Sequence, residues 1–410
     1  MPFFYSLFIH CYAGLIKIAS LFSKKAKLWC RGRKNVFPFL EERCAGKENV
    51  VWFHCASLGE FEQGKPLMEK LKQQDEKVTI LVTFFSPSGF EIKKNTPVAD
   101  MVVYLPTDTR KNAKKFIQMV KPQKVFFIKY EFWFNYMVEL AKNNIPFYYV
   151  SAIFRENQYF FKRYGKWFLK QLKKCSFFFV QNEKSKELLQ KHKIENAIVA
   201  GDTRFDRVYY IAHQSYTLDF IVSFKEEKKL LVAGSTWLPD EKLLSNLFSQ
   251  MNRNYKLVIA PHCIDNNHIA QIKKCFDSFS VVCFSGKETQ TVSNYDVLII
   301  DAIGILSKVY KYADVSYLGG AFKTGLHNIL EAAVFEKPVF FGPHYQKFNE
   351  AVELVKNGGA FSVKKASEMA EIINSFNNNP QLYHATCNIC KNFVAQNLGA
   401  TKKIINHLII

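Results

Sequence analysis

Residues 50–60 read VVWFHCASLGE, and this stretch decides the fold class. Its first part, Val50 to His54, is a run of apolar, β-branched and aromatic residues without apolar–polar alternation. Such a run is typical of a strand that is covered on both faces of a parallel sheet. A polar turn with Ser57 and Gly59 follows, and a helix-length stretch begins after it. The pattern therefore predicts a strand–turn–helix unit of an α/β protein.

The same unit recurs along both halves of the chain. Helix-length stretches rich in Lys, Glu and Leu separate the strand-like runs. In the first half these runs cover residues 50–54, 78–83, 101–105, 125–128, 147–150, 177–180 and 197–199. In the second half they cover residues 230–233, 257–260, 281–284, 297–300, 315–318 and 339–341. Because 410 residues can bury two cores, we expect two doubly wound domains with parallel sheets.

The domain boundaries follow from where the strand-like runs stop. No such run appears between Asp206 and the charged stretch that begins at Lys225. We therefore expect a first domain over residues 23–205, an interdomain linker over 206–228 and a second domain over 229–385. A C-terminal helix is expected over 386–410, and it could pack back on the first domain.

The N-terminal segment has the composition of a membrane-associated helix. Residues 3–22 are almost continuously apolar, and six basic residues follow between Lys24 and Lys34. No basic region precedes the run and no small-residue cleavage site follows it, so a cleaved signal peptide is not expected. The run could span a bilayer, lie in its interface, or form a core helix of a soluble protein. We predict a membrane anchor or interfacial helix over residues 1–22, with the remaining chain on the cytoplasmic side.

The charge balance indicates an anionic partner. Lys and Arg total 56 against 36 acidic residues, which gives a formal net charge of +20. Nucleic acid, an acidic membrane and a phosphorylated substrate would all match this charge, but no nucleic-acid-binding signature occurs. The sequence also lacks the glycine motifs of dinucleotide enzymes and NTPases, and a D-x-D pair that would hold a divalent metal. We therefore predict no cofactor, no metal and no nucleic-acid partner.

Polar residues in the first half follow the predicted strands, where open parallel sheets bind their ligands. Glu60 is a candidate base toward a substrate hydroxyl, or else one half of a capping box with Ser57. Arg204 could hold a phosphate or pair with a neighbouring aspartate. For the remaining candidates, a helix cap or a structural ion pair is the alternative to ligand binding. They are Ser57, Gly59, Thr83, Ser86, Gly89, Lys129 and Glu131.

Glycine and polar residues follow the strands of the second half in the same way. Gly319 and Gly320 could let the backbone approach a ligand, or could simply form a tight turn. Glu331, one turn into the next helix, could accept hydrogen bonds from ribose hydroxyls or could lie on a solvated helix face. The other candidates at these strand ends are Pro261, His262, Ile303, Gly304, Ile305, Asn328, Ile329 and Leu330.

Together these segments resemble those of the transferases that add 3-deoxy-D-manno-octulosonic acid (Kdo) during lipopolysaccharide assembly. The stretch from His54 to Glu60 is similar to an H-x-x-S-x-G-E element of that family, and Thr83 to Gly89 is similar to its T-x-T-x-T-G turn. Gly201 to Asp206 resembles a G-x-x-K-F-D element, with arginine in place of lysine. The second-half segments resemble CMP-binding elements. The resemblance extends, in order, from about residue 3 to beyond residue 360.

The resemblance implies a GT-B fold, in which two Rossmann-like domains face each other across a cleft. It implies CMP-Kdo as donor, a lipid A precursor (lipid IVA) as acceptor, and a location at the anionic cytoplasmic face of the inner membrane. Glu60 would be the general base of an inverting, metal-independent transfer, and Arg204 and Lys129 would stabilise the transition state. The CMP site would comprise Pro261, His262, Ile303, Gly304, Ile305, Asn328, Ile329, Leu330 and Glu331. A glycosyltransferase that uses a UDP-sugar and a lipid-linked acceptor, and a nucleotide-sugar 2-epimerase, are the alternatives.

The sequence departs from the family pattern at three places near the predicted site. Lys129 stands where the family often has the first glutamate of E-x-E-x-W-P-N, so Glu131 could serve in its place. His262 replaces the arginine of P-R-H, which removes a permanent positive charge. Ile305 replaces the glutamate of M-G-E-L. Details of donor or acceptor binding are therefore expected to differ from those of other members.

Overall fold

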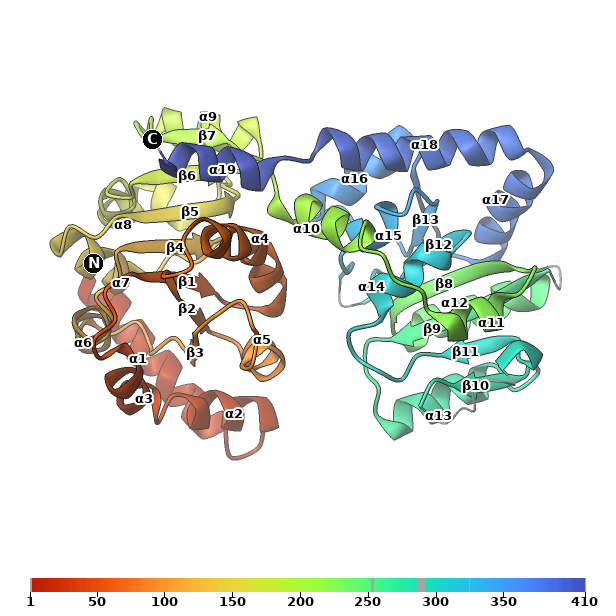
Figure 1. The fold of residues 1–410 in the computed structure, drawn as a ribbon, viewed down its shortest axis with the longest axis horizontal. Coiled ribbons are helices and arrows are strands. Elements are labelled where there is room, and N and C mark those ends of the chain that lie inside the picture. The colour runs from red at the N-terminus through yellow and green to blue at the C-terminus, as the bar shows by residue number, and fades with distance from the viewer. Residues whose placement is uncertain (1, 252–253, 286–291, 324, 410) are drawn as a thin grey trace. The chain divides into compact units, whose positions relative to one another are not determined.

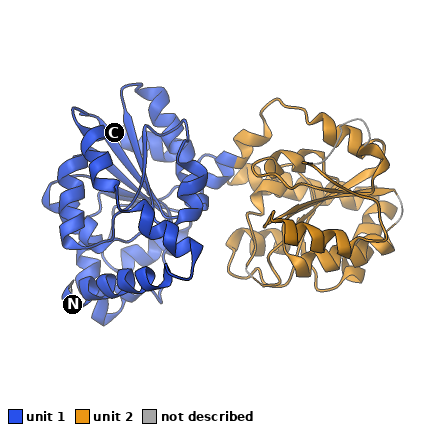
Figure 2. Cartoon of the chain, turned by 90° about the horizontal axis from the view of Figure 1, so that it is seen from below, with its two compact units in different colours: residues 1–207, 398–410 blue, residues 208–397 orange. Residues whose placement is uncertain are grey.

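The computed structural model describes residues 2–251, 254–285, 292–323 and 325–409. The chain forms two compact units, which Figure 2 shows in different colours. Unit 1 comprises Met1–Arg207 and Leu398–Ile410, and unit 2 comprises Val208–Asn397. The chain thus leaves unit 1 once and returns to it at its C-terminal end.

Within the described residues, unit 1 contains a seven-stranded parallel sheet with the order β3-β2-β1-β4-β5-β6-β7 (Figure 1). Its strands are β1 (Val50–Cys55), β2 (Thr79–Phe84), β3 (Met101–Tyr104), β4 (Lys124–Ile128), β5 (Phe147–Ala152), β6 (Phe177–Val180) and β7 (Ala197–Val199). All seven runs predicted in the first half are therefore strands.

Helices cover both faces of this sheet. They are α1 (Pro2–Ala19), α2 (Lys24–Gly32), α3 (Val36–Cys44), α4 (Leu58–Gln74), α5 (Pro87–Lys93), α6 (Arg110–Val120), α7 (Phe134–Lys142), η1 (Tyr159–Phe161), η2 (Arg163–Gly165), α8 (Lys166–Leu172), α9 (Glu183–Lys191) and α19 (Ala400–Ile409). Every residue of β1 is buried, as its unbroken apolar pattern predicts. On one face, the Trp52 ring lies 4.8 Å from that of Phe116 and 5.6 Å from those of Phe127 and Tyr136, centroid to centroid.

Unit 2 has the same architecture, with the strand order β10-β11-β9-β8-β12-β13-β14 in its described part. Its strands are β8 (Lys229–Thr236), β9 (Tyr255–Pro261), β10 (Val281–Cys283), β11 (Val297–Ile299), β12 (Val315–Leu318), β13 (Val339–Phe341) and β14 (Ala360–Ser362). Its helices are α11 (Asp219–Lys225), α12 (Leu238–Gln250), α13 (Asn266–Cys275), η3 (Val292–Asn294), α14 (Leu306–Val309), η4 (Tyr310–Tyr312), α15 (Leu330–Ala333), α16 (Asn349–Asn357), α17 (Ala366–Asn378) and α18 (Pro380–Gln396). The sequence predicted six of these strands and missed β14.

Residues 206–228, expected as a linker, are mostly helical. α10 (Thr203–Ala212) crosses the boundary between the units, and α11 follows it in unit 2. Ile221 and Phe224 of α11 are fully buried. Amphipathic helices of this kind carry no strand-like run, which is why the sequence pattern marked only a gap.

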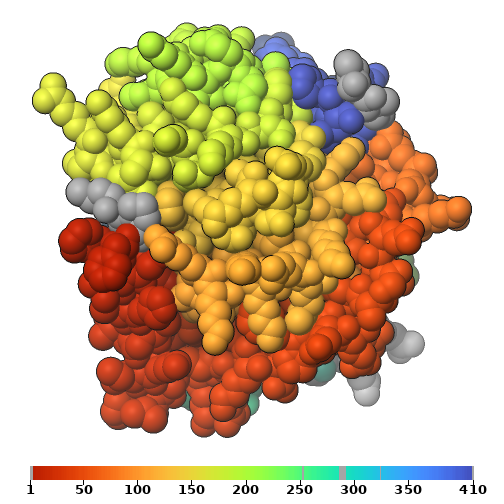
Figure 3. All heavy atoms as spheres, turned by 90° about the vertical axis from the view of Figure 1, so that its left-hand side faces the viewer, coloured from red at the N-terminus to blue at the C-terminus, as the bar shows by residue number. Residues whose placement is uncertain are grey.

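The expected C-terminal helix over 386–410 is two helices. α18 ends at Gln396 in unit 2, and α19 begins at Ala400 in unit 1. Between them Gly399 has a φ of +96°, a left-handed conformation that favours glycine. α19 places Ile404 and Ile405 in a hydrophobic cluster beneath the sheet of unit 1. Figure 3 shows that α19 (blue) and the N-terminal segment (red) lie apart from each other on this face of the protein.

α1 is docked on unit 1 by a few residues and leaves much of its surface exposed. Its Tyr5 hydroxyl donates a hydrogen bond of 2.6 Å to Asp108 Oδ2, and Ile9 is buried. Phe3, Phe4, Leu7, Phe8, Leu15 and Ile18 remain exposed. Among the helices that the structure describes, none is both long enough and apolar enough to cross a membrane.

Asp206 fixes the start of α19. Its two carboxylate oxygens accept hydrogen bonds of 2.7 Å from the backbone N–H groups of Gly399 and Thr401. Asp206→Ala leaves these two donors without their partner, so we expect a loss of about 1–2 kcal/mol in the free energy of unfolding. Urea denaturation measures this loss, and hydrogen exchange should show faster opening of α19. The exposed Asp277→Ala is the control, and equal stability of the two variants would contradict the assignment.

Candidate catalytic and nucleotide sites

The predicted site residues of unit 1 lie at the carboxyl ends of its strands. Ser57, Gly59 and Glu60 lie between β1 and the first turn of α4, and Ser86 and Gly89 begin α5 after β2. Lys129 and Glu131 follow β4, and Arg204 follows β7. Because the strands are parallel, their carboxyl ends share one edge of the sheet.

Glu60 has both the capping contact and an unusual proton affinity. Its Oε2 accepts a hydrogen bond of 3.1 Å from the Ser57 N–H, within a capping box that starts α4. Burial and, next, the nearby Glu131 carboxylate raise the pKa of Glu60 to about 8, although Lys129 and backbone N–H groups act in the opposite direction. A carboxyl group with a pKa near neutrality is suited to proton transfer. The two roles considered for Glu60 are therefore compatible.

A buried hydrogen-bond chain holds Glu131 in place. Its Oε2 accepts a bond of 2.8 Å from Trp133 Nε1 and lies 3.0 Å from His54 Nε2. His54 is fully buried, and its Nδ1 lies 2.8 Å from the Thr83 hydroxyl. A carboxylate can only accept, so Nε2 of His54 carries the proton in this pair. The sequence did not single out His54 as a site residue, although it stands first in the H-x-x-S-x-G-E element.

Thr83 extends this hydrogen-bond chain from His54 to Trp52. It is fully buried, and its hydroxyl accepts a bond of 2.8 Å from Trp52 Nε1 as well as contacting His54. The buried hydroxyl therefore orients His54, and the acceptor contact expected of Thr83 stays a prediction. The Ser86 hydroxyl lies 2.9 Å from that of Ser88. Gly89 is required by packing, because a Cβ there would lie 2.5 Å from the Phe84 ring.

Lys129 adopts a backbone conformation that is rare for lysine. Its φ is +67°, and its N–H donates a bond of 2.9 Å to the Val150 carbonyl. A non-glycine residue in this region costs about 1–3 kcal/mol, and such strain is concentrated at functional sites. Its ammonium is close enough to oppose the rise in the pKa of Glu60. Lys129 thus contributes a positive charge where the family often has a glutamate.

Arg204 is paired with Asp202, one of the alternatives considered from the sequence. Its Nε and an Nη donate bonds of 2.9 and 2.7 Å to Asp202 Oδ2. Gln63 donates a further bond of 2.9 Å to Asp202 Oδ1. Burial acts to raise the pKa of Asp202, but the Arg204 charge and these bonds outweigh it, so that the pKa lies below its usual value. The pair holds the guanidinium in one orientation after β7.

The predicted nucleotide residues of unit 2 likewise follow its strands. Pro261 and His262 lie at the end of β9, residues 303–305 follow β11, and Gly319 and Gly320 follow β12. Ile303 is 71% exposed, and Gly304 has a φ of +92°. Ile329 and Leu330 are fully buried, so their side chains pack in the core and only their backbone could meet a ligand.

A stack of three aromatic rings lies at these strand ends. The Trp237 ring is 4.6 Å from that of His262, which is 4.7 Å from that of His327, centroid to centroid. Burial, and then the neighbouring His262, lower the pKa of His327 to about 4, and burial also lowers the pKa of His262. Both imidazoles are therefore predominantly neutral near pH 7. Trp237 was missed in the sequence, where it is an isolated aromatic residue after β8.

Three buried polar atoms in this stack or next to it have no hydrogen-bond partner within the described part of the chain. They are Trp237 Nε1, His327 Nε2 and Asn328 Oδ1. A buried polar atom left unpaired costs about 1–3 kcal/mol. Asn328 Nδ2, by contrast, donates a bond of 3.1 Å to Glu331 Oε1. The Trp237 indole N–H could donate to a polar ligand, and the Asn328 amide oxygen could accept from one.

Asp240 joins the ends of β8 and β12. It is fully buried and accepts bonds of 2.9 Å from the Trp237 N–H, 3.0 Å from the Gly320 N–H and 2.8 Å from the Tyr317 hydroxyl. Gly319 permits the close approach of the two strand ends, because a Cβ there would lie 2.4 Å from the Ser235 carbonyl oxygen. The glycine pair therefore serves the packing of these turns, whichever ligand they meet.

The sequence matches known proteins over most of its length. The model of the family described as 3-deoxy-D-manno-octulosonic-acid transferase matches residues 32–207. The 3-deoxy-D-manno-octulosonic acid transferase of Aquifex aeolicus is 27% identical over 342 residues, which cover 82% of this chain and 88% of that protein. The resemblance to the Kdo transferase family that the sequence predicts is confirmed. The chain is also 26% identical over 349 residues to a bifunctional glycosyltransferase/methyltransferase of Fusobacterium nucleatum, covering 81% of this chain but 53% of that longer protein.

Solved structures show which fold this chain shares. The UDP-GlcNAc 2-epimerase of Neisseria meningitidis superimposes with a TM-score of 0.63 at 16% sequence identity, covering 88% of this chain and 99% of the epimerase. At this identity the likeness concerns the fold alone. The predicted α/β architecture of two Rossmann-like, parallel-sheet domains is confirmed.

The raised pKa of Glu60 predicts a specific pH dependence of stability. The folded protein keeps the Glu60 proton at pH values where the unfolded chain has released it, so this group makes the fold less stable as the pH rises from about 5 to about 8. Glu60→Gln removes this effect, while its amide oxygen can still accept from the Ser57 N–H. At pH 8 we expect the variant to be more stable than the wild type by up to about 4 kcal/mol, at about 1.4 kcal/mol for each pKa unit.

Urea denaturation at several pH values measures this difference. Glu60→Ala, which also loses the capping contact, should be less stable than Glu60→Gln at every pH, by about 1 kcal/mol. Glu131→Gln removes the neighbouring charge and should weaken the pH dependence. Parallel pH profiles for the wild type and Glu60→Gln would show that the pKa of Glu60 is ordinary.

Proposed function

We propose that this protein transfers Kdo from CMP-Kdo to a lipid A precursor, lipid IVA, at the cytoplasmic face of the inner membrane. The similarity to Kdo transferases supports a glycosyltransferase of this class. The observation that carries the mechanism is the half-buried Glu60 carboxyl at the strand ends of unit 1, with its pKa raised to about 8. The exposed apolar side chains of α1 support contact with a membrane interface.

In the proposed reaction, the Glu60 carboxylate takes the proton of an acceptor sugar hydroxyl. The hydroxyl oxygen forms a bond to the anomeric carbon of Kdo, the bond from that carbon to the CMP phosphate breaks, and CMP leaves with the electron pair. Attack opposite the leaving group inverts the anomeric centre. Lys129 and the Asp202-held Arg204 would offset negative charge in the transition state. His54 would keep Glu131 oriented beside Glu60.

The strand ends of unit 2 are proposed to hold CMP. His327 Nε2 and Asn328 Oδ1 are buried and unpaired among the described residues, and a nucleotide can satisfy such atoms. Because His262 and His327 are predominantly neutral, they would meet the CMP phosphate as hydrogen-bond partners and not as fixed charges. Glu331, to which Asn328 donates, is placed to accept from the ribose hydroxyls. Pro261 and the turn from Ile303 to Ile305 would complete the site.

Glu60→Gln tests the catalytic assignment. We expect the rate of Kdo transfer to fall by about 100-fold or more, in the range that general base catalysis contributes, while CMP binding stays within about twofold. Purified protein is incubated with CMP-Kdo and lipid IVA, and the product is identified by mass spectrometry. Wild-type protein that makes no Kdo-lipid product would overturn the proposed function, and full activity of Glu60→Gln would overturn the mechanism.

Asn328→Ala tests the nucleotide assignment separately. We expect CMP to bind about tenfold more weakly, because a hydrogen-bonding group that contributes about 1.4 kcal/mol is removed. Isothermal titration calorimetry with CMP measures this change. Asn266→Ala, an exposed asparagine of the same unit, is the control. Unchanged affinity of Asn328→Ala would place the nucleotide elsewhere.

The Kdo transfer assay also separates the alternative functions. CMP, and not UDP, should compete with the donor, whereas a UDP-sugar transferase would show the reverse. A nucleotide-sugar 2-epimerase would convert free nucleotide sugar in the absence of any lipid.

A further inference from the structure

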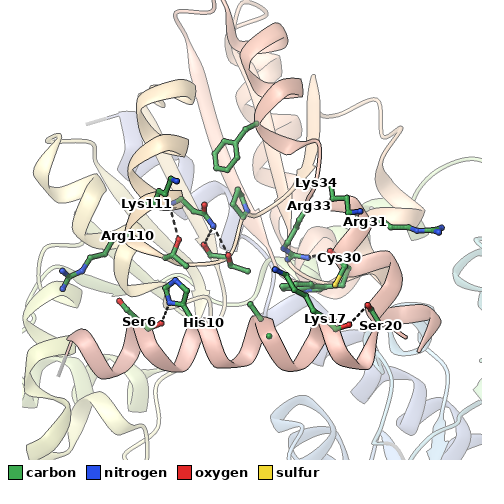
Figure 4. A pocket seen from close by; sticks show the side chains of 18 of the residues that line it. Ser6, His10, Lys17, Ser20, Cys30, Arg31, Arg33, Lys34, Arg110 and Lys111 are labelled. Carbon is green, nitrogen blue, oxygen red and sulfur yellow. Dashed lines mark hydrogen bonds between the residues drawn. The ribbon is translucent and has the colours of Figure 1, made fainter. Parts of the chain in front are cut away.

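A wide groove lies along one side of α1, within unit 1. Its volume is about 1240 Å³, and α1, the segment from Lys27 to Phe37 and the segment from Pro106 to Asn112 line it. In the close view, His10 and Lys17 extend from α1 toward the opposite wall, which carries Arg110 and Lys111 at one end and Arg33 at the other (Figure 4). None of the residues in the Glu60–Glu131–His54 group lines this groove. It is therefore a separate feature of unit 1.

The groove is lined by cations without balancing carboxylates. The basic residues that line it are Lys17, Lys27, Arg31, Arg33, Lys34, Arg110 and Lys111, and the lining contains no Asp or Glu. Within the described residues, none of these seven forms an ion pair with an acidic side chain. Clustered like charges repel one another, so an anion that enters the groove relieves this repulsion.

Arg33 is held rigidly at the wall of the groove by uncharged groups. Its guanidinium donates to the carbonyl oxygens of Leu105 and Phe85 at 2.9 Å and of Trp29 at 3.1 Å. It also lies 3.8 Å from the centroid of the Trp29 ring. Burial lowers the pKa of Arg33 to about 9, so the group remains charged at pH 7. The protein thus fixes one positive charge here with dipoles and a ring face, which leaves that charge uncompensated.

The surface beside the groove is apolar. Outside the groove, α1 and the turn after it expose large side chains over the full length of the helix: Phe4, Leu7, Phe8, Leu15, Ile18 and Phe22. The Tyr5–Asp108 hydrogen bond fixes α1 to the body of unit 1. The apolar surface of α1 is therefore held in a fixed position next to the basic groove. Nucleic acid matches the charge but not the adjoining apolar surface. A phospholipid matches both, since its phosphate is anionic and its acyl chains are apolar.

We propose that this groove is a discrete binding site for the phosphate headgroup of an anionic bilayer phospholipid, whose acyl chains lie along α1. The proposal deepens the proposed membrane location of this transferase and rests on it. Lys17 from α1, Lys34 after α2 and Lys111 from α6 line the groove from three separate elements, and Arg33 supplies the fixed charge at the wall. The site holds unit 1 on the bilayer in a defined orientation, which a diffuse basic surface does not.

The test uses the full chain without donor or acceptor, so that its outcome is independent of catalysis. Sedimentation with vesicles of phosphatidylcholine and phosphatidylglycerol, or of phosphatidylcholine alone, measures membrane binding. The variant K17Q/K34Q/K111Q neutralises three exposed groove cations. The control K173Q/K174Q/K184Q removes the same charge from exposed lysines of unit 1 outside the groove. Calorimetry with monomeric dihexanoyl phosphatidylglycerol, and with inorganic phosphate, tests for a discrete lipid site.

We expect the wild type to prefer the vesicles with phosphatidylglycerol and to bind one short-chain lipid per protein. The groove variant should bind these vesicles about 100-fold more weakly, at about fivefold for each lysine, and the control should change by less than threefold. Equal losses of vesicle binding in both variants would show that binding depends on total charge and not on the groove, which would overturn the proposal. Inorganic phosphate that binds as tightly as the short-chain lipid would also overturn it, because the acyl chains would then contribute nothing. Loss of Kdo transfer with intact lipid binding would overturn only the proposed function.

Discussion

Parallel pairing of the strands is the constraint on which both candidate sites depend. In each described sheet every strand runs in the same direction as its neighbours, so all carboxyl ends meet at one edge. Residues as far apart as His54 and Glu131 thereby come within 3.0 Å of each other. The parallel pairing requires a helical crossover after each strand. Where these helices begin, the Ser57 N–H donates to Glu60 and the Trp237 N–H donates to Asp240.

The two edges differ in their electrostatics, although their architecture is the same. Unit 1 places two carboxyl groups and a lysine together, and burial and the Glu131 carboxylate raise the pKa of Glu60 to about 8 against the opposing effect of Lys129. Unit 2 places neutral imidazoles, an indole and an amide together, with the Glu331 carboxylate bonded to the amide of Asn328, and it buries Asp240 and Glu241, which hold turns and side chains. One edge is therefore suited to moving a proton, and the other to hydrogen bonding with a polar ligand. This division fits a glycosyl transfer in which one substrate must lose a proton and the other carries a nucleotide.

Local sequence patterns predicted the sheets well, because buried parallel strands are marked by the composition of the strand itself. β14 was missed since its three residues, Ala360 to Ser362, include no β-branched side chain. The division of the C-terminal segment at Gly399 was missed because helical residues lie on both sides of it. The sequence also could not show that Thr83 faces His54, or that Trp237 stacks on His262. These contacts depend on strand order and on side-chain packing, which no single stretch of sequence encodes.

The return of α19 to unit 1 has a consequence for biosynthesis. Ile404 and Ile405 complete a cluster that also contains Phe53 of β1 and Phe126 of β4, so residues near both ends of the chain share one core. During translation, the first 207 residues emerge long before these two isoleucines, and unit 2 emerges between them. The apolar strip of the nascent first unit therefore stays uncovered until α19 has emerged from the ribosome. Unit 2, whose segments are contiguous, can finish folding first.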